Sequence, residues 1–183
     1  MITRGKQEIR QEKLLARSKI SSELREQKET KIFDTFFQHP GVQNSKTIAL
    51  YYSIKKEVNT LLIIKRLFAL KVNVLLPRMD GNNLKFYHIT NLTTDLEFNL
   101  RFNLYEPLNS LPIINAEKID VLVVPIVAFD QNNFRLGYGK GYYDRFLKNY
   151  HHLVIGLAFI EQLVPTPLPV EEHDVKIEII ISA

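Results

Sequence analysis

The glycine-rich segment near residue 140 is the part of this chain whose residue types and spacing most clearly indicate chemistry. Three of the seven glycines lie within five residues, Gly137, Gly139 and Gly141, with Lys140 between the last two. Glycine lets a backbone approach a ligand closely and expose its N–H groups. An apolar run over 119–124 precedes the segment, and a helix is predicted over 142–149. A strand, a glycine turn and a helix N-terminus in that order favour an anion, and phosphate is the first ligand to consider.

Neither of two common nucleotide-binding patterns fits this segment. The dinucleotide pattern requires a third glycine where Tyr142 stands, and a P-loop requires Ser or Thr after its lysine, where Gly141 stands. A flexible turn without a ligand is the alternative. The pattern therefore indicates a phosphate site without identifying a nucleotide fold.

Charged residues near the glycines could complete a phosphate and metal site. Lys140, Asp144 and Lys148 share one face of the predicted helix. This spacing suggests phosphate contact by Lys140 and Mg²⁺ binding by Asp144. Arg135 could bind phosphate through two hydrogen bonds, and Asp174, before the last predicted strand, could be a second Mg²⁺ ligand. The alternatives are a surface salt bridge worth about 0.3–0.5 kcal/mol, a solvated arginine and a turn-capping Asp.

One acidic residue and two tyrosine pairs lie where an α/β sheet would present ligand contacts. Glu57 follows the first predicted strand and precedes a helix, although a Glu near a helix N-terminus is also favoured by the helix dipole. The tyrosines could stack on a flat heteroaromatic ring, or they could be ordinary core-edge residues: Tyr51, Tyr52, Tyr142 and Tyr143.

Composition limits the class of protein. The 183 residues, 45% of them hydrophobic, suffice for one well-packed domain. The absence of cysteine excludes disulfides and thiolate catalysis, and the charged start is not a secretory signal. The longest apolar stretch, 121–129, is too short to cross a bilayer. We therefore expect a cytoplasmic protein without a membrane partner.

The net charge of +4 is concentrated at the N-terminus. Residues 1–31 contain nine Lys or Arg and five Glu, so the remainder of the chain is neutral. A basic arm can indicate an anionic partner, but a solvated helical face is the better interpretation for most of these charges.

Periodicity predicts an α/β fold. Helices are expected from Thr3 to Gln38, with a break at 18–22 where Ser21 or Ser22 caps a second helix whose apolar face includes Leu24, Ile32 and Phe36. Further along, we expect helices at 60–69 and 142–149, strands at 47–52, 72–76, 84–88, 119–125, 153–159 and 175–181, and a short strand near Leu104. We therefore expect a single three-layer α/β/α domain over 1–183, with a mostly parallel central sheet, an N-terminal helical arm over 1–39, and ligands beyond the carboxyl ends of the strands.

Together these segments resemble the 5-formyltetrahydrofolate cyclo-ligase family. The resemblance is strongest from Val124-Pro125 through Phe129-Asp130 to the segment Arg135–Arg145. It continues in Lys6 and Arg10, in residues 57–60, in 76–78 and in His173-Asp174. Residues 80–118 carry none of it. Asn133, Glu178 and Ser182 depart from the usual family pattern.

The resemblance implies an ATP- and Mg²⁺-dependent ring closure. Folinate, 5-formyltetrahydrofolate, becomes 5,10-methenyltetrahydrofolate with release of ADP and phosphate, through an N5-iminium phosphate. The substrate is itself phosphorylated, so the protein mainly positions two ligands and neutralises phosphate charge. A monomer that acts on a small molecule, possibly polyglutamylated, and binds no nucleic acid is the corresponding expectation.

The resemblance also implies a role for each matching residue. By resemblance, the residues expected to contact phosphate and nucleotide are Lys6, Arg10, Arg135, Leu136, Gly137, Tyr138, Gly139, Lys140, Gly141, Tyr142 and Tyr143. Folate contacts fall to Tyr52, to Glu57 as the anchor of the pterin ring, and to Tyr138, Gly139, Lys140, Gly141 and Tyr142. Asp144 and Asp174 are expected to bind magnesium. The expected catalytic residues are Lys140, Arg135 and Tyr142.

Two hypotheses from other classes remain at this point. A nucleotide- or nucleic-acid-binding module would use the basic arm, but residues 1–31 contain no aromatic residue to stack on bases. A sugar-phosphate isomerase would use the glycine segment to hold a phosphoester and would not require ATP.

Overall fold

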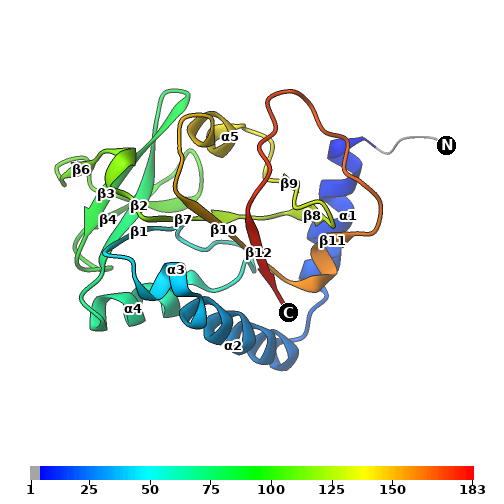
Figure 1. Ribbon diagram of the computed structural model, residues 1–183, viewed down its shortest axis with the longest axis horizontal. Coiled ribbons are helices and arrows are strands. Elements are labelled where there is room, and N and C mark those ends of the chain that lie inside the picture. The colour runs from blue at the N-terminus through cyan, green and yellow to red at the C-terminus, as the bar shows by residue number, and fades with distance from the viewer. Residues whose placement is uncertain (1–4) are drawn as a thin grey trace.

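A seven-stranded sheet forms the centre of the structure, a computed structural model that describes residues 5–183 (Figure 1). Five neighbouring strands are parallel, and β3 and β6 join antiparallel at one edge. The prediction of a mostly parallel central sheet is therefore confirmed. The order across the sheet is β12 (Ile179–Ser182), β10 (Leu153–Ala158), β7 (Val121–Pro125), β1 (Thr47–Ala49), β2 (Asn73–Asp80), β3 (Asn83–Ile89) and β6 (Ile113–Ile114).

Apolar side chains on both faces of this sheet explain its solid Val, Ile and Leu runs. Successive side chains of a strand point to opposite faces. In β7, Val121 and Val123 enter one buried cluster, whereas Leu122 and Val124 enter the other. A parallel sheet needs such cover on both sides.

Helices α2 (Ser22–Gln38), α3 (Pro40–Gln43) and α4 (Thr60–Ala69) cover one face, and α5 (Tyr142–Leu147) lies on the other (Figure 1). The Ser21 side chain accepts a hydrogen bond from the Leu24 backbone, as predicted for the cap of the second helix. Ile32 and Phe36 are buried, but Leu24 is 43% exposed, so the prediction that Leu24 belongs to the apolar face is wrong.

The first helix, α1 (Lys6–Ser18), packs on residues 160–162 and on a small second sheet. That sheet has the order β11 (Leu163–Val164), β8 (Ala128–Asp130), β9 (Arg135–Leu136). Ile9 of α1 is buried against Leu136 of β9 and Val164 of β11. The predicted helix start at Thr3 lies outside the described residues.

The small sheet also changes the expected route into the glycine segment. The predicted sequence of strand, glycine turn and helix is wrong in detail, because β8 and β9 form an antiparallel hairpin between β7 and the glycines. Asn133, in the connection between those two strands, has a φ of 63°, a conformation that asparagine tolerates. Helix α5 also ends two residues earlier than predicted.

Residues 80–118, which the sequence left largely unassigned, contribute several short elements. The residues Asp80-Gly81-Asn82-Asn83, a strong turn signal in the sequence, join β2 and β3 as a hairpin. A two-stranded ribbon of β4 (Leu96–Asn99) and β5 (Leu104–Pro107) follows, and the short 3₁₀-helix η1 (Ala116–Lys118) precedes β7. A second 3₁₀-helix, η2 (Ile160–Gln162), follows β10. The last strand is shorter than predicted, since residues 175–178 are not part of it.

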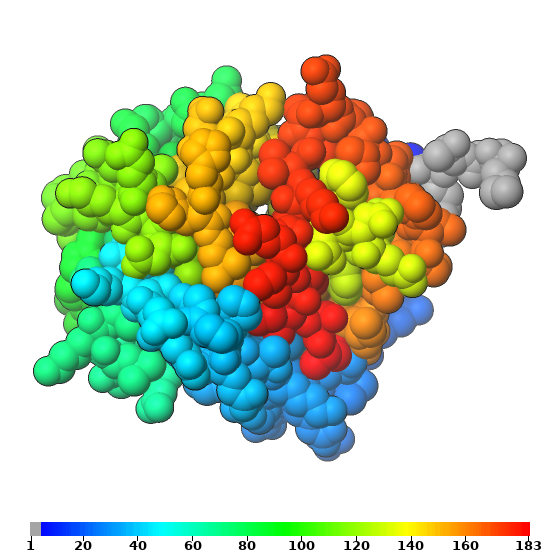
Figure 2. All heavy atoms as spheres, in the orientation of Figure 1, coloured from blue at the N-terminus to red at the C-terminus, as the bar shows by residue number. Residues whose placement is uncertain are grey.

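The C-terminal segment crosses the outside of the molecule. In the space-filling view, the red residues of β12 lie between the residues that surround α5 and those of the small sheet (Figure 2). The connection before β12 pairs Asp174 with Lys6 of α1 and brings Asp174 to the same cavity as the glycine segment, although both are far from it in sequence.

Candidate active site

A cavity of about 560 Å³ lies at the carboxyl ends of the parallel strands. Tyr51 follows β1, Met79 is the last but one residue of β2 and Pro125 ends β7, and all three line the cavity. The expectation that ligands bind beyond these strand ends is therefore supported by a real hollow. Every residue that the sequence assigned to the site lines this cavity: Lys6, Arg10, Tyr52, Glu57, Arg135, Leu136, Gly137, Tyr138, Gly139, Lys140, Gly141, Tyr142, Tyr143, Asp144 and Asp174.

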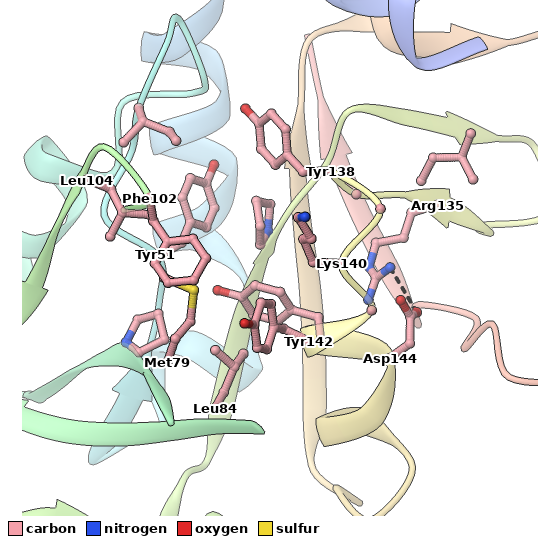
Figure 3. A pocket seen from close by; sticks show the side chains of 18 of the residues that line it. Tyr51, Met79, Leu84, Phe102, Leu104, Arg135, Tyr138, Lys140, Tyr142 and Asp144 are labelled. Atoms are coloured by element: carbon pink, nitrogen blue, oxygen red, sulfur yellow. Dashed lines mark hydrogen bonds and ion pairs between the residues drawn. The ribbon is translucent and has the colours of Figure 1, made fainter. Parts of the chain in front are cut away.

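The two walls of the cavity differ in chemistry. Figure 3 shows Met79, Leu84, Phe102 and Leu104 on one side, and the glycine segment with Arg135 and Asp144 on the other. Lys140 and Tyr142 lie between them. One wall thus suits a flat apolar body, and the other suits an anion.

The glycine segment is shaped by left-handed backbone. Gly139 has a φ of 90° and Gly141 a φ of 67°, values that residues with a Cβ rarely adopt. A Cβ on Gly139 would lie 3.3 Å from the Arg10 guanidinium carbon. The Arg10 Nε donates a hydrogen bond to the Gly137 carbonyl at 2.8 Å, so α1 packs directly on this loop.

Arg135 is a buried arginine with unused hydrogen-bond donors. Its side chain is 3% exposed, and its Nη1 lies 3.0 Å from Asp144 Oδ1. Its Nε and Nη2 are buried without a hydrogen-bond partner. Buried donors are seldom left unpaired in folded proteins, so these two point to an anionic ligand that would accept from them.

Lys6 and Asp174 form a second ion pair beside the loop. The Lys6 Nζ lies 2.6 Å from Asp174 Oδ2, which also accepts from the Glu171 backbone N–H at 2.8 Å. Partial burial opposes the charge of Asp174, but the hydrogen bonds from Lys6 and Glu171 outweigh it and lower its pKa. Asp174 is therefore held as a carboxylate.

A complete metal site is not preformed. Among residues 5–183, no group of three or more His, Asp or Glu side chains is arranged to hold an ion. Asp144 and Asp174 both line the cavity, and each is paired with a cation of the chain. The role of these two residues in metal binding stays a prediction.

Lys140 is available to a ligand. Within the described residues its ammonium group has no hydrogen-bond or ion-pair partner, although it lines the cavity. A second hollow of about 330 Å³ is lined by Lys140, Asp144 and Lys148 together with Arg145 and His173. The prediction that Lys140 shares a helix face with the other two is wrong, because α5 begins at Tyr142 and Lys140 lies in the loop before it.

Glu57 is a buried carboxylate that also lines the cavity. It is 7% exposed, its Oε2 accepts from the Ile54 backbone N–H at 2.8 Å, and its Oε1 accepts from the Tyr138 hydroxyl at 2.9 Å. Burial raises the pKa of Glu57, although these hydrogen bonds and the charges of Arg17 and Lys55 act against the rise. A carboxylate with both oxygens fixed in this way can accept further N–H groups from a ligand.

The four tyrosines all line the cavity but differ in burial and in their partners. Tyr52 lines the cavity with its ring 5.4 Å from that of Tyr105. Tyr142 reaches across to donate to the Gly81 carbonyl at 3.2 Å. Tyr51 is 5% exposed and donates to the Val58 carbonyl, and burial also raises the pKa of Tyr143.

Sequence reasoning missed most of the apolar wall. Its members come from β2, β3 and the ribbon of β4 and β5, where no motif marks them: Met79, Leu84, Phe102, Leu104 and Tyr105. The hairpin turn at 80–83 was the only available signal. It placed β3 beside β2 but could not show that the ribbon folds over the same cavity.

Fold and cavity together define an α/β enzyme site in which a glycine loop with unpaired cationic groups faces an apolar, aromatic wall. Residues 2–183 match the sequence model of the 5-formyltetrahydrofolate cyclo-ligase family. This chain belongs to that family.

Individual relatives agree. A Haemophilus influenzae protein named 5-formyltetrahydrofolate cyclo-ligase is 31% identical over 96% of both chains. An Escherichia coli protein of the same name is 35% identical over 79% of this chain and 81% of its own. The solved structure of Aquifex aeolicus 5,10-methenyltetrahydrofolate synthetase has a TM-score of 0.85 at 32% identity and covers 97% of this chain and 89% of that one. The fold and the class of enzyme predicted from sequence are confirmed.

Proposed function

We propose that this protein converts 5-formyltetrahydrofolate to 5,10-methenyltetrahydrofolate, consuming ATP with Mg²⁺ and releasing ADP and phosphate. One observation carries the proposal: one cavity is lined both by the unpaired donors of Arg135 and Lys140 and by the buried carboxylate of Glu57. These two sets of groups match the two ligands of the reaction. A nucleotide supplies phosphates, and a pterin supplies ring N–H groups.

The residues of the polar wall fit ATP phosphates. Arg135 offers Nε and Nη2, and Lys140 offers an unpaired ammonium. Gly137, Gly139 and Gly141 let the backbone approach an anion closely. Lys6, Arg10, Leu136, Tyr138, Tyr142 and Tyr143 complete the proposed nucleotide contacts. Arg135 and Lys140 would also stabilise charge on the phosphate during transfer.

Magnesium would be held by Asp144 and Asp174. Mg²⁺ commonly takes one or two carboxylates and completes its shell with phosphate oxygens and waters. In the structure each carboxylate is paired with a proposed phosphate ligand, Asp144 with Arg135 and Asp174 with Lys6. Arrival of phosphates and metal together would let cations and carboxylates exchange partners without leaving either charge unpaired.

The apolar wall fits the folate. Glu57 would accept two N–H groups of the pterin, and Tyr52 would pack on the ring system. Tyr142 reaches across the cavity and would hold the formyl group near the transferred phosphate. Phosphorylation turns the formyl oxygen into a leaving group, and N10 can then close the ring. The proposed work of the protein is to bring these groups into contact and exclude water.

The same proposal includes a cytoplasmic monomer that binds no nucleic acid. The basic arm supports it, because Arg17 and Arg25 donate to backbone carbonyls of their own chain and are not free for phosphates of a polymer. None of the helices described is long and apolar enough to span a membrane. Polyglutamylated folinate is a proposed substrate on the same basis as folinate itself.

The test is a spectrophotometric assay of purified protein with folinate. We expect the methenyl chromophore to grow only with MgATP and to stop when magnesium is chelated. The Lys140→Ala variant should fold normally and require far more ATP, whereas Lys65→Ala, an exposed lysine of α4, should behave as the parent. No chromophore from folded protein that still binds ATP would refute the folate half of the proposal. Growth without ATP would refute the nucleotide half.

A further inference from the structure

Arg17 is a buried arginine of α1 to which the sequence assigned no function. Only 2% of it is exposed, and within the described residues it forms no ion pair. Its guanidinium donates to the Ile126 carbonyl at 3.5 Å, to the Lys55 carbonyl at 3.2 Å and to the Tyr138 hydroxyl at 3.0 Å. Burial of a cation without a carboxylate beside it is costly, so the location of its counter-charge matters.

That counter-charge is Glu57, one hydroxyl away. The Tyr138 oxygen accepts from Arg17, and its proton is donated to Glu57 Oε1 at 2.9 Å. Burial and the charge of Glu57 raise the pKa of Tyr138 to about 12, so the hydroxyl keeps the proton that it donates. A hydroxyl that accepts from a cation is a better donor, because hydrogen bonds in a chain polarise one another.

The turn that carries Glu57 is held from the same side. Lys55 and Lys56 have φ values of 47° and 63°, which are uncommon for residues with a Cβ. Arg17 donates to the Lys55 carbonyl, and Arg25 of α2 donates to the Lys56 carbonyl at 2.7 Å. Both arginines support the backbone of the turn, but only Arg17 is connected to the Glu57 carboxylate.

We propose that Arg17 is a positioning residue for the folate. Acting through the Tyr138 hydroxyl, it fixes the orientation and the negative charge of the Glu57 carboxylate that accepts the pterin N–H groups. The inference rests on the proposed role of Glu57. Arg17 would connect the N-terminal helix to the proposed folate contacts. Lys6 and Arg10 on the same helix belong to the proposed nucleotide contacts.

A double-mutant cycle on the KM for folinate tests this connection. Arg17→Lys keeps the charge but loses the fork that reaches both Lys55 and Tyr138, and Tyr138→Phe removes only the hydroxyl. We expect each change to raise the KM for folinate about tenfold, the effect of losing a hydrogen bond to a charged group. The double variant should be no worse than Tyr138→Phe alone. Arg17→Lys should leave the KM for ATP within about twofold, since Arg17 bonds to the Tyr138 hydroxyl and to the Lys55 and Ile126 carbonyls and not to the proposed phosphate donors Arg135 and Lys140.

Arg25→Lys is the matched control, because it disturbs the same turn without touching the carboxylate. An equal rise in the KM for folinate in Arg25→Lys would overturn the inference, as would single-variant losses that multiply in the double variant. If Arg17→Lys does not fold, Arg17→Gln compared in the parent and Tyr138→Phe backgrounds decides the same question. Glu57→Gln distinguishes the proposed role of Glu57 from the inference about Arg17. An unchanged KM for folinate in Glu57→Gln overturns both. A raised KM for folinate in Glu57→Gln, together with a parental KM for folinate in Arg17→Lys, overturns the inference alone.

Discussion

Arg135 and Asp144 form a buried ion pair at the edge of the glycine loop, with Nη1 and Oδ1 3.0 Å apart and side chains 3% and 17% exposed. The pair joins β9 to the first turn of α5 and so fixes the loop between them. It also leaves Nε and Nη2 of Arg135 buried without acceptors. One half of this guanidinium is paired within the chain, and the other half carries the donors that we propose bind phosphate.

This division predicts the effect of Arg135→Lys. A lysine can keep one contact with Asp144 but cannot supply the two remaining donors. Loss of hydrogen bonds to a charged phosphate should raise the KM for ATP by about tenfold to a hundredfold. Steady-state kinetics at saturating folinate measure this. Arg78→Lys is the control, because Arg78 pairs with Glu97 outside the cavity. A parental KM for ATP in Arg135→Lys would exclude Arg135 from nucleotide binding.

The glycine loop predicts unequal effects of two alanine substitutions. Gly139→Ala places a Cβ 3.3 Å from Arg10 on backbone with a φ of 90°, whereas a Cβ on Gly137 meets nothing within 4 Å. The left-handed strain alone is about 1–2 kcal/mol. We expect a loss of kcat/KM for ATP of about tenfold or more in Gly139→Ala and a clearly smaller loss in Gly137→Ala. Equal losses in the two variants would contradict the geometry described for the loop.

The raised pKa of Glu57 predicts that folate binding weakens at acidic pH. Burial raises the pKa of Glu57, although the hydrogen bonds from the Ile54 N–H and the Tyr138 hydroxyl and the charges of Arg17 and Lys55 act to lower it. As pH falls through that raised pKa, Glu57 takes up a proton and can no longer accept two N–H groups. The KM for folinate should therefore rise on the acidic side with a midpoint above about 4.3, the value of an ordinary Glu.

The Glu57→Gln variant is the control for this pH dependence. Its KM for folinate should be high at every pH and should lack the acidic limb, because the side chain no longer titrates. The buried tyrosines beside Glu57, Tyr51 and Tyr143, have raised pKa values and stay protonated across this range. An acidic limb that persists in Glu57→Gln would assign the titration to another group. Circular dichroism should confirm that the variant is folded.

Two apolar residues of helix α2 should contribute very differently to the free energy of unfolding. Ile32 is 1% exposed, whereas Leu24, on the same helix, is 43% exposed. Ile32→Ala should lower the free energy of unfolding by about 2–5 kcal/mol because it leaves a cavity in the core. Leu24→Ala should cost much less, within about 1 kcal/mol, since half of its side chain is already in water. Urea denaturation of both variants measures the difference, and similar midpoints would contradict the burial of Ile32.

Local sequence was sufficient for most of the elements. The helix at Thr60–Ala69 and the cap at Ser21 depend on interactions between near neighbours, so pattern reasoning found both. The glycine segment was equally readable, since its backbone needs residues without a Cβ whatever lies around it. The hairpin β8–β9 was missed because strands this short are stabilised by the packing of α1 on them.

Residue types and their spacing along the chain were enough to predict the phosphate-binding residues and the carboxylates near them. The tertiary structure sets their partners. Lys6 meets Asp174 across 168 positions, and Arg17 reaches Glu57 only through Tyr138. It also built the apolar wall from β2, β3 and the ribbon of β4 and β5. Such contacts join segments distant in sequence, and they are set by how the buried faces of the sheets and helices pack, which no local pattern encodes.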